Sequence, residues 1–172
     1  DALAVKKFIH EIEKIQGIYG SNYRNAFAKS YKWTSMLTKN LPNTINNPDL
    51  DILKNKFPEK TAVIISAGPS LDENIEQLIP YKDNVLIFCV GTALRTALKH
   101  GIVPDFVATI ETSPNTKKQL NVPELDQINV IASTNSYYGI YDLNPRNFLN
   151  YHQNKDLASR WLTEILELSH ND

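Results

Sequence analysis

The sequence predicts an α/β fold with a doubly wound, Rossmann-like and mainly parallel sheet, preceded by an N-terminal helical segment. Two observations predict it. From residue 61 onward, short apolar runs alternate with short helical patterns, which is typical of strands joined by helical crossovers. Before residue 58, apolar residues instead recur at the three- and four-residue steps of amphipathic helices. We therefore divide the chain into a helical segment with a linker, residues 1–57, and a Rossmann-like domain, residues 58–172.

The N-terminal part predicts two helices and a linker. The first spans residues 2–17, and two glycines bracket its end. The second begins at Ser21 or Asn22 and runs to about residue 39. Residues 40–58 are rich in Asn and Pro, so we expect a linker there with one short helix over residues 49–56.

The remaining residues predict four strands separated by helices. Their apolar runs are short and bounded by turn residues, as buried strands of a parallel sheet are. A long segment rich in Tyr and Asn, residues 137–154, reads as a loop. The expected strands are residues 62–66, 85–90, 106–110 and 129–132, and the expected helices are residues 70–78, 93–99, 116–120 and 156–168.

Composition limits the classes of function. The 172 residues suffice for one domain and an appendage, and 42% hydrophobic with 22% charged residues is ordinary for a soluble globular protein. A net charge of −1 provides no basic field, so we expect no nucleic-acid partner. No apolar run approaches membrane-spanning length, and we expect no membrane insertion. Cys89 has no disulfide partner, which fits a reducing compartment, and its apolar run indicates a buried, inert thiol.

The segment TAVIISAGPSL, residues 61–71, combines a strand, a tight turn and a helix start. Its apolar run predicts a strand covered on both faces. Gly68 permits a positive φ or a close approach to the backbone, and Pro69 suits a first helical turn. Ser70 stands three residues before Glu73, the spacing of a capping box. A helix start favours phosphate through its free N–H groups, but a strand-to-helix turn that binds nothing has the same pattern.

Three further strand ends support binding at this turn. The carboxyl ends of parallel strands meet at one edge, and α/β sheets bind ligands there, near the switch in strand order. Four segments therefore come together, and all are small or polar: residues 66–70, 91–92, 111–115 and 133–136. We expect one shared crevice along this edge.

Several catalytic and phosphate-binding motifs are absent from the sequence. It contains neither the dinucleotide fingerprint nor a P-loop, and no Cys/His cluster with zinc-ligand spacing. Without Gly-x-Ser-x-Gly, Ser70 is better explained as a helix cap than as a nucleophile.

Few acid–base candidates remain. Glu111 ends the third strand and either faces the crevice, to bind a ribose hydroxyl, a metal or an amine, or pairs with Lys117. His152 lies in the Tyr/Asn-rich loop and either reaches the site or is simply exposed. His100 ends a helix on the opposite edge, where it favours the helix terminus. Asp105 pins the loop before the third strand on that same edge.

The motifs AVIISAGPSLDENI and VLIFCVGTALRTALKHGIVPDFVATIE resemble the central domain of the motility accessory factor (Maf) proteins, and the preceding NLPNTINNPDLDILKNKFPEKTAV resembles that family's lead-in. The resemblance covers residues 40–115 best. Maf proteins are bacterial cytoplasmic enzymes implicated in O-glycosylating flagellin with nonulosonic acids from CMP-activated donors. Their central domain is similar to bacterial sialyltransferases, which share the Gly-Pro-Ser-Leu turn under the CMP. An archaeal hydroxymethyl-dihydropterin diphosphokinase carries a related domain.

The resemblance implies a CMP-nonulosonate donor, flagellin as acceptor, a cytoplasmic location and no cofactor or metal. Mg²⁺ is expected only under the alternative, an ATP-dependent pterin diphosphokinase. A third alternative is a nucleotide- or flagellin-binding module that is inactive alone. The nucleotide- and donor-binding residues implied are Ser66, Gly68, Pro69, Ser70, Gly91, Thr92, Glu111, Thr112, Ser133, Thr134 and Asn135.

This chain differs from the Maf family in two respects that bear on the implied function. The family usually has Asp where this chain has Glu111, which leaves a metal or ribose role for that side chain open. Family members also continue with further strands and helical domains, so we expect this chain to be part of a longer protein. The implied transfer is a displacement at the anomeric carbon with CMP leaving and a base deprotonating a Ser/Thr hydroxyl. The catalytic base is not identified.

Overall fold

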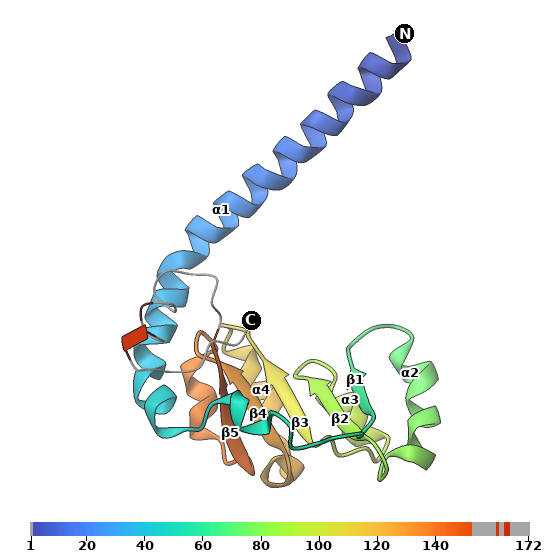
Figure 1. The fold of residues 1–172 in the computed structure, drawn as a ribbon, viewed down its shortest axis with the longest axis vertical. Helices are drawn as coiled ribbons and strands as arrows, with labels where there is room; N and C mark the ends of the chain where they lie inside the picture. Colours follow the sequence, from blue (N-terminus) through green and yellow to red (C-terminus); the bar gives the residue numbers. More distant parts are fainter. Residues whose placement is uncertain (1, 153–160, 162–163, 166–172) are drawn as a thin grey trace.

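The structure is a computed structural model that describes residues 2–152, 161, 164 and 165. Five parallel strands form one sheet, and they lie side by side in chain order (Figure 1). The α/β class and the parallel sheet are therefore confirmed. The strands are β1 Ala62–Ile65, β2 Leu86–Val90, β3 Phe106–Thr109, β4 Asn129–Ser133 and β5 Asn147–Tyr151.

Strand β5 was not predicted, because its residues fall in the segment read as a loop. Asn147 and Asn150 interrupt its apolar pattern, and Asn is more typical of turns than of strands. The structure satisfies both amides. Asn147 donates to the side-chain oxygen of Asn129 at 2.8 Å, and Asn150 donates to two carbonyl groups at the end of the N-terminal helix.

Short helices connect the strands. They are close to the predicted ones. Strands β1, β2 and β3 and helix α3 are each one residue shorter than predicted, β4 and α4 are each one residue longer, and the helix predicted over residues 70–78 is observed as α2 followed by η2. The helix expected over residues 156–168 lies almost wholly outside the described residues. The connections are α2 Leu71–Asn74 and η2 Ile75–Tyr81, α3 Leu94–Lys99, α4 Asn115–Leu120 and η3 Pro123–Gln127, and η4 Tyr138–Asp142.

The two faces of the sheet are covered differently. One face packs against all the crossover helices in a core that joins Ile87 and Val130 of the sheet to Leu94 of α3 and Leu120 of α4. The other face presents Phe106, Ile131 and Leu149 to the short helix η1 Leu50–Leu53. Since the crossovers share one face and the strands keep their chain order, the described strands do not include the switch in strand order that we expected beside the ligand.

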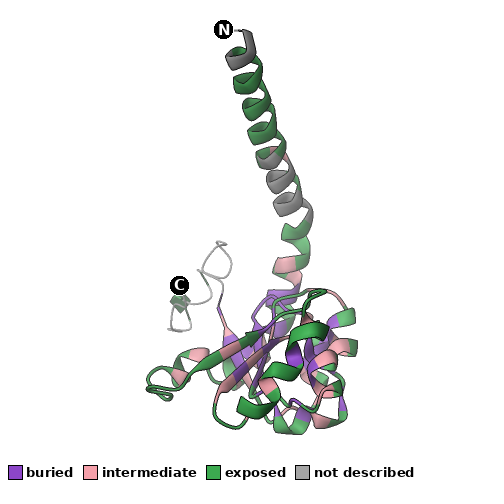
Figure 2. Ribbon diagram, turned by 90° about the vertical axis from the view of Figure 1, so that its right-hand side faces the viewer, coloured by how far each residue is buried: buried purple, intermediate pink, exposed green. Residues whose placement is uncertain are grey.

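The N-terminal segment is one helix, α1 Ala2–Asn46, and not the two predicted. Gly17 and Gly20 lie inside it with no positive φ, so they weaken the helix without ending it. The helix also continues through Pro42 into the region predicted as linker. Its first two thirds project away from the sheet (Figure 1), and the described residues there are largely exposed (Figure 2). No described helix combines the length and apolar character needed to cross a membrane.

The last turns of α1 pack on the sheet, where Met36, Leu37, Asn40 and Thr44 are buried. The chain then passes along the outer edge of β5. The carbonyl oxygen of Pro48 accepts a hydrogen bond of 2.8 Å from the amide of Asn150. The edge of β5 is thus covered by the chain itself, whereas β1 forms the opposite edge of the sheet. Among the residues of β1 only Ile65 is buried, so the prediction of a strand covered on both faces was wrong.

Candidate functional site

The turn after β1 is open to solvent. Residues 66–70 are all exposed, and no atom lies within 4 Å of where a Cβ on Gly68 would be. Gly68 has no positive φ, so the fold itself does not require glycine here. The amide of Leu71 donates to the carbonyl oxygen of Gly68 at 3.0 Å, which closes the turn. The space above Gly68 is therefore available to a ligand.

The capping box predicted at this turn does not form. Ser70 has a helical backbone conformation and makes no side-chain cap hydrogen bond, and α2 begins at Leu71. The hydroxyl of Ser70 is consequently not engaged by the first turn of the helix. Ser66 and Ser70 line a hollow of about 320 Å³ between β1 and α2. The apolar side chains of Val63, Leu71 and Ile75 also line this hollow.

The turn after β2 contributes one buried and one exposed residue. Gly91 is buried, and its amide donates to the carbonyl oxygen of Ala108 at 3.1 Å. Thr92 is exposed. It is not the N-cap of α3 as predicted, because Ala93 occupies that position without a side-chain cap bond. The hydroxyl of Thr92 therefore does not cap α3 and is exposed at the same edge of the sheet as the turn after β1.

Glu111 and Thr112 follow β3 at this edge. Glu111 is exposed, and its backbone carbonyl accepts a hydrogen bond of 2.9 Å from the amide of Tyr137. The ion pair considered with Lys117 is absent, because Lys117 pairs with Asp142 at 2.6 Å. The backbone at Glu111 is thus held in place while its carboxylate faces solvent, which fits a role in binding a polar ligand.

The segment after β4 lies under α1 and is closed. Ser133 and Thr134 are fully buried, and Asn135 is 5% exposed. The side-chain amide of Asn40 donates to the carbonyl oxygens of Thr134 and Ser136, both at 2.8 Å. The hydroxyl of Ser136 in turn donates to the carbonyl oxygen of Thr109 at 3.0 Å. The structure therefore brings together the open segments after β1, β2 and β3, and it places the fourth behind helix α1.

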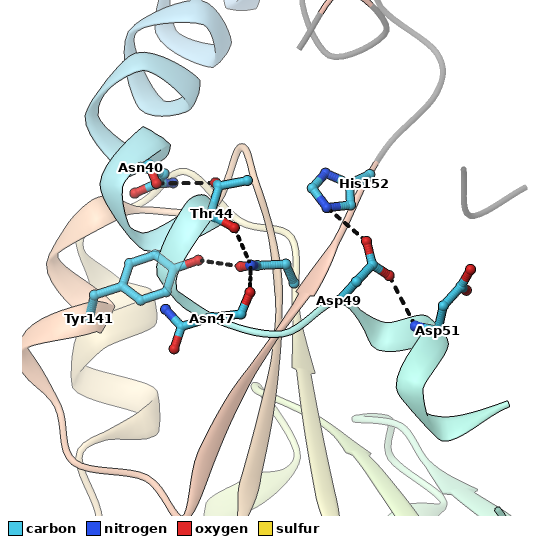
Figure 3. A network of polar contacts seen from close by, with 8 residues as sticks. Asn40, Thr44, Asn47, Asp49, Asp51, Tyr141 and His152 are labelled. Carbon is cyan, nitrogen blue, oxygen red and sulfur yellow. Dashed lines mark hydrogen bonds and ion pairs between the residues drawn. The ribbon is translucent and has the colours of Figure 1, made fainter. Parts of the chain in front are cut away.

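A polar network joins α1 to the end of β5 (Figure 3). The side-chain amide of Asn150 donates to the carbonyl oxygens of Thr44 and Asn47 at 3.0 and 2.9 Å. His152 is 2% exposed, and its Nε2 lies 3.0 Å from a carboxylate oxygen of Asp49. His152 was predicted either to reach the site or to be exposed, and the structure excludes the exposed alternative because the side chain is buried. Sequence reasoning missed the roles of Asn40, Asp49 and Asn150, since all three lay in segments read as linker or loop.

The opposite edge of the sheet carries residues with structural roles. The carboxylate of Asp105 accepts a hydrogen bond of 2.8 Å from the amide of Ile87, which confirms that it pins the loop before β3. His100 ends α3 as predicted and lies 3.7 Å from a carboxylate oxygen of Glu76. Within β2, Cys89 is buried as predicted, and burial raises the pKa of its thiol to about 12, which disfavours the reactive thiolate. The described residues contain no group of three His, Cys, Asp or Glu side chains placed to hold a metal ion.

Fold and site together define an α/β protein with a parallel sheet and an open, polar edge at its carboxyl ends. A family model described as 6-hydroxymethylpterin diphosphokinase MptE-like matches residues 35–172, and the chain belongs to this family. The match begins inside α1, shortly before the residues that pack on the sheet. The relation to a pterin diphosphokinase domain that the sequence resemblance implied is thereby confirmed.

Two individual proteins are similar to this chain. An uncharacterized protein of Treponema pallidum (strain Nichols) is 28% identical over 105 residues, which are 61% of this chain and 44% of that protein. A structure of the MAf glycosyltransferase from Magnetospirillum magneticum AMB-1 is 29% identical, with a TM-score of 0.49, over 58% of this chain and 16% of that one. The chain thus spans less than half of each relative, and the relatives' whole-protein activities are not carried over to it.

Proposed function

We propose that the carboxyl edge of β1, β2 and β3 binds the nucleotide of an activated donor, and that the chain is the donor-binding part of a transferase. The carrying observation is the open turn at Ser66–Ser70, with vacant space above Gly68 and the exposed Thr92 and Glu111 at the same edge. Backbone N–H groups after a parallel strand and hydroxyl side chains are suited to phosphate and ribose. Membership of a family described as a diphosphokinase supports a phosphate-bearing ligand.

The donor that we propose is a CMP-activated nonulosonic acid, transferred to a Ser or Thr hydroxyl of flagellin in the cytoplasm. The sequence resemblance to Maf proteins supports this choice through the Gly68-Pro69-Ser70-Leu71 turn. In this proposal Ser66, Gly68 and Ser70 receive the phosphate, Gly91 and Thr92 line the nucleotide pocket, and Glu111 and Thr112 lie beside the ribose. A base outside this set removes the proton of the acceptor hydroxyl as the CMP phosphate leaves.

Ser133, Thr134 and Asn135 take a second role in the proposal. They were predicted as donor contacts, but α1 covers them in the present arrangement. We propose that they support the floor of the pocket through the hydrogen bond from Ser136 to Thr109, the last residue of β3. Direct contact with the sugar would need α1 to move away from this segment.

A diphosphokinase is the second candidate function, and the family description favours it. Such an enzyme would bind ATP with Mg²⁺ at the same edge. Mg²⁺ is commonly held by one or two carboxylates together with substrate phosphates. Glu111 is an exposed carboxylate at this edge and would hold the ion, which polarises the phosphate when bound.

Calorimetric titration distinguishes these functions. The chain is titrated separately with CMP, CMP-sialic acid and ATP, each with and without Mg²⁺. Binding of CMP and CMP-sialic acid independent of Mg²⁺ supports the glycosyltransferase. Binding of ATP only with Mg²⁺, without any CMP binding, supports the diphosphokinase and overturns the first proposal. No heat with any ligand identifies a module that does not bind nucleotide alone.

A further inference from the structure

The second face of the sheet, opposite the crossover helices, is only partly covered. Strand register places Ile64 beside Phe88 and Phe88 beside Phe106 on this face. The ring of Phe57 packs edge-on against Phe106, on the side where η1 also lies. Toward the carboxyl ends of the strands, the side chain of Ile64 is 75% exposed, and that of Ile110, directly after β3, is 57% exposed. We call Ile64, Phe88 and Ile110 the open patch.

A parallel sheet with an open apolar patch is unusual. Parallel sheets occur almost only with both faces covered, because their strands are apolar on both sides. The first face of this sheet is covered by the crossover helices. The open patch therefore calls for a covering segment.

The chain after β5 contains an apolar surface of the right kind. A helix is predicted over residues 156–168, most of which lie outside the described residues. At about 100° per residue, the charged side chains fall on one half of this helix and the large apolar ones on the other. Trp161 and Ile165 belong to the apolar half, and they are 63% and 57% exposed. The apolar half consists of Leu157, Ala158, Trp161, Leu162, Ile165, Leu166 and Leu168.

Contacts at the end of β5 direct the chain toward the second face. The outer edge of β5 is occupied, because Asn150 forms a bridge with Asp49. Directly after β5, Nε2 of the buried His152 lies 3.0 Å from a carboxylate oxygen of Asp49 (Figure 3). Asp49 is the N-cap of η1, and η1 lies on the second face. The chain thus leaves β5 beside the element that already covers part of this face.

Length and handedness agree with this direction. Residues 152–156 reach up to about 17 Å when extended, and two strand spacings are about 10 Å. A helix over residues 156–168 is about 20 Å long, and the four spacings from β5 to β1 are about 19 Å. The crossovers from β1 to β5 advance in one direction on the first face, so a right-handed connection that runs back toward β1 lies on the second face.

We propose that the apolar half of residues 156–168 packs as a helix on the open patch of the same chain. Trp161 and Ile165 then lie against Ile64, Phe88 and Ile110, and all five side chains are uncharged. The charged half of the segment faces solvent. This packing does not rest on the proposed function, and it gives the sheet a second covered face.

Hydrogen exchange followed by mass spectrometry tests the packing on the whole chain. An isolated helix of this length is marginal in water, so the amides of residues 156–168 are protected only if the segment packs on another surface. The wild-type chain should exchange slowly there. Ile64→Lys and Ile110→Lys each place a charge in the open patch and should speed this exchange at least about tenfold.

Matched controls accompany both surfaces. Ile79 is 41% exposed on η2, which packs on the first face, so Ile79→Lys should leave the protection unchanged. Within the segment, Ile165→Lys should lose the protection, whereas Glu164→Lys should keep it because Glu164 lies on the charged half. Slow exchange of the β4 amides verifies in every variant that the sheet is folded.

Three outcomes overturn the proposal. The first is fast exchange over residues 156–168 in the wild-type chain. The second is equal protection in Ile64→Lys, Ile110→Lys and Ile79→Lys, which would place the segment on another surface. The third is protection that rises with protein concentration, which would identify the segment of a second copy as the occupant.

The fluorescence of Trp161 tests the same contact independently. The chain has two tryptophans, Trp33 and Trp161, so Trp33→Phe leaves Trp161 as the single emitter. In this background, packing on the open patch predicts emission at a shorter wavelength than that of tryptophan in water, and a shift to longer wavelength when Ile64→Lys is added. Emission like that of tryptophan in water without the second substitution overturns the proposal.

Discussion

The side-chain amide of Asn40 lies 2.8 Å from the carbonyl oxygen of Thr134, 94 residues further along the chain. The same amide also donates to Ser136. This buried contact ties the long helix α1 to the segment that follows β4. It explains why a helix that otherwise projects into solvent has a defined position on the sheet.

Removing this amide should destabilise the domain. The variant Asn40→Ala leaves two buried carbonyl groups without a donor, which costs about 2–4 kcal/mol of unfolding free energy. Urea unfolding followed by tryptophan fluorescence measures it. Asn46→Ala is the matched control, because Asn46 is exposed and its amide bonds only to Pro42 within the same helix. Equal effects of the two substitutions would contradict the anchoring role of Asn40.

The continuity of α1 predicts a gain from replacing its glycines. Gly17 and Gly20 have no positive φ and no atom within 4 Å of an added Cβ. Gly17→Ala and Gly20→Ala should each stabilise the helix by about 0.5–1 kcal/mol and raise the helical signal in far-UV circular dichroism. If the chain turned at these glycines, as the sequence pattern suggested, the substitutions would leave the signal unchanged or reduce it.

Buried acidic groups predict a loss of stability in alkali. Burial raises the pKa of Cys89 from 9.0 to about 12 and the pKa of Tyr141 from 10.0 to about 12. In the unfolded chain both groups ionise at lower pH, so the stability that they contribute is complete below pH 9 and is lost as the pH rises toward 12. Each group adds a slope of up to about 1.4 kcal/mol per pH unit in its window.

Unfolding free energies measured between pH 8 and pH 11 check this expectation. Cys89→Ala should flatten the alkaline decline while lowering stability at neutral pH, because it leaves a small cavity. A decline as steep in Cys89→Ala as in the wild type would show that the thiol is not the group responsible.

The substitution Gly68→Val tests the open turn without disturbing the fold. Nothing in the structure lies within 4 Å of the added Cβ, and the backbone there has no positive φ. The unfolding free energy should therefore change by less than about 1 kcal/mol, whereas nucleotide affinity should fall at least about tenfold because the isopropyl group occupies the phosphate position. Unchanged affinity in a folded Gly68→Val variant would remove the turn from the site.

The sequence predicted the parallel sheet well because its first four strands are short apolar runs bounded by turn residues. Val107 and Val130, for example, lie in such runs and are fully buried. It failed at β5, where Asn150 stands in the middle of a strand. The side-chain amide of Asn150 donates hydrogen bonds to the carbonyl groups of Thr44 and Asn47, more than a hundred residues earlier. A local sequence pattern cannot indicate acceptors so far away in the chain.

The candidate site, like the sheet, could be predicted from local sequence patterns only in part. The exposed positions of Ser66, Thr92 and Glu111 at one edge follow from the ends of parallel strands, which local patterns reveal. The closure over Thr134 depends on Asn40, in a segment that reads as a linker because it contains Asn and Pro. Long-range packing of α1, rather than local propensity, decided that part of the structure.

Amide NMR spectra recorded during a CMP titration test the central claim most directly. The account predicts that the resonances of Ser66, Gly68, Ser70, Thr92 and Thr112 shift together with one dissociation constant, while those of Ile87 and Asp105 at the opposite edge stay in place. Shifts confined to the opposite edge, or no shifts at saturating CMP, would contradict it.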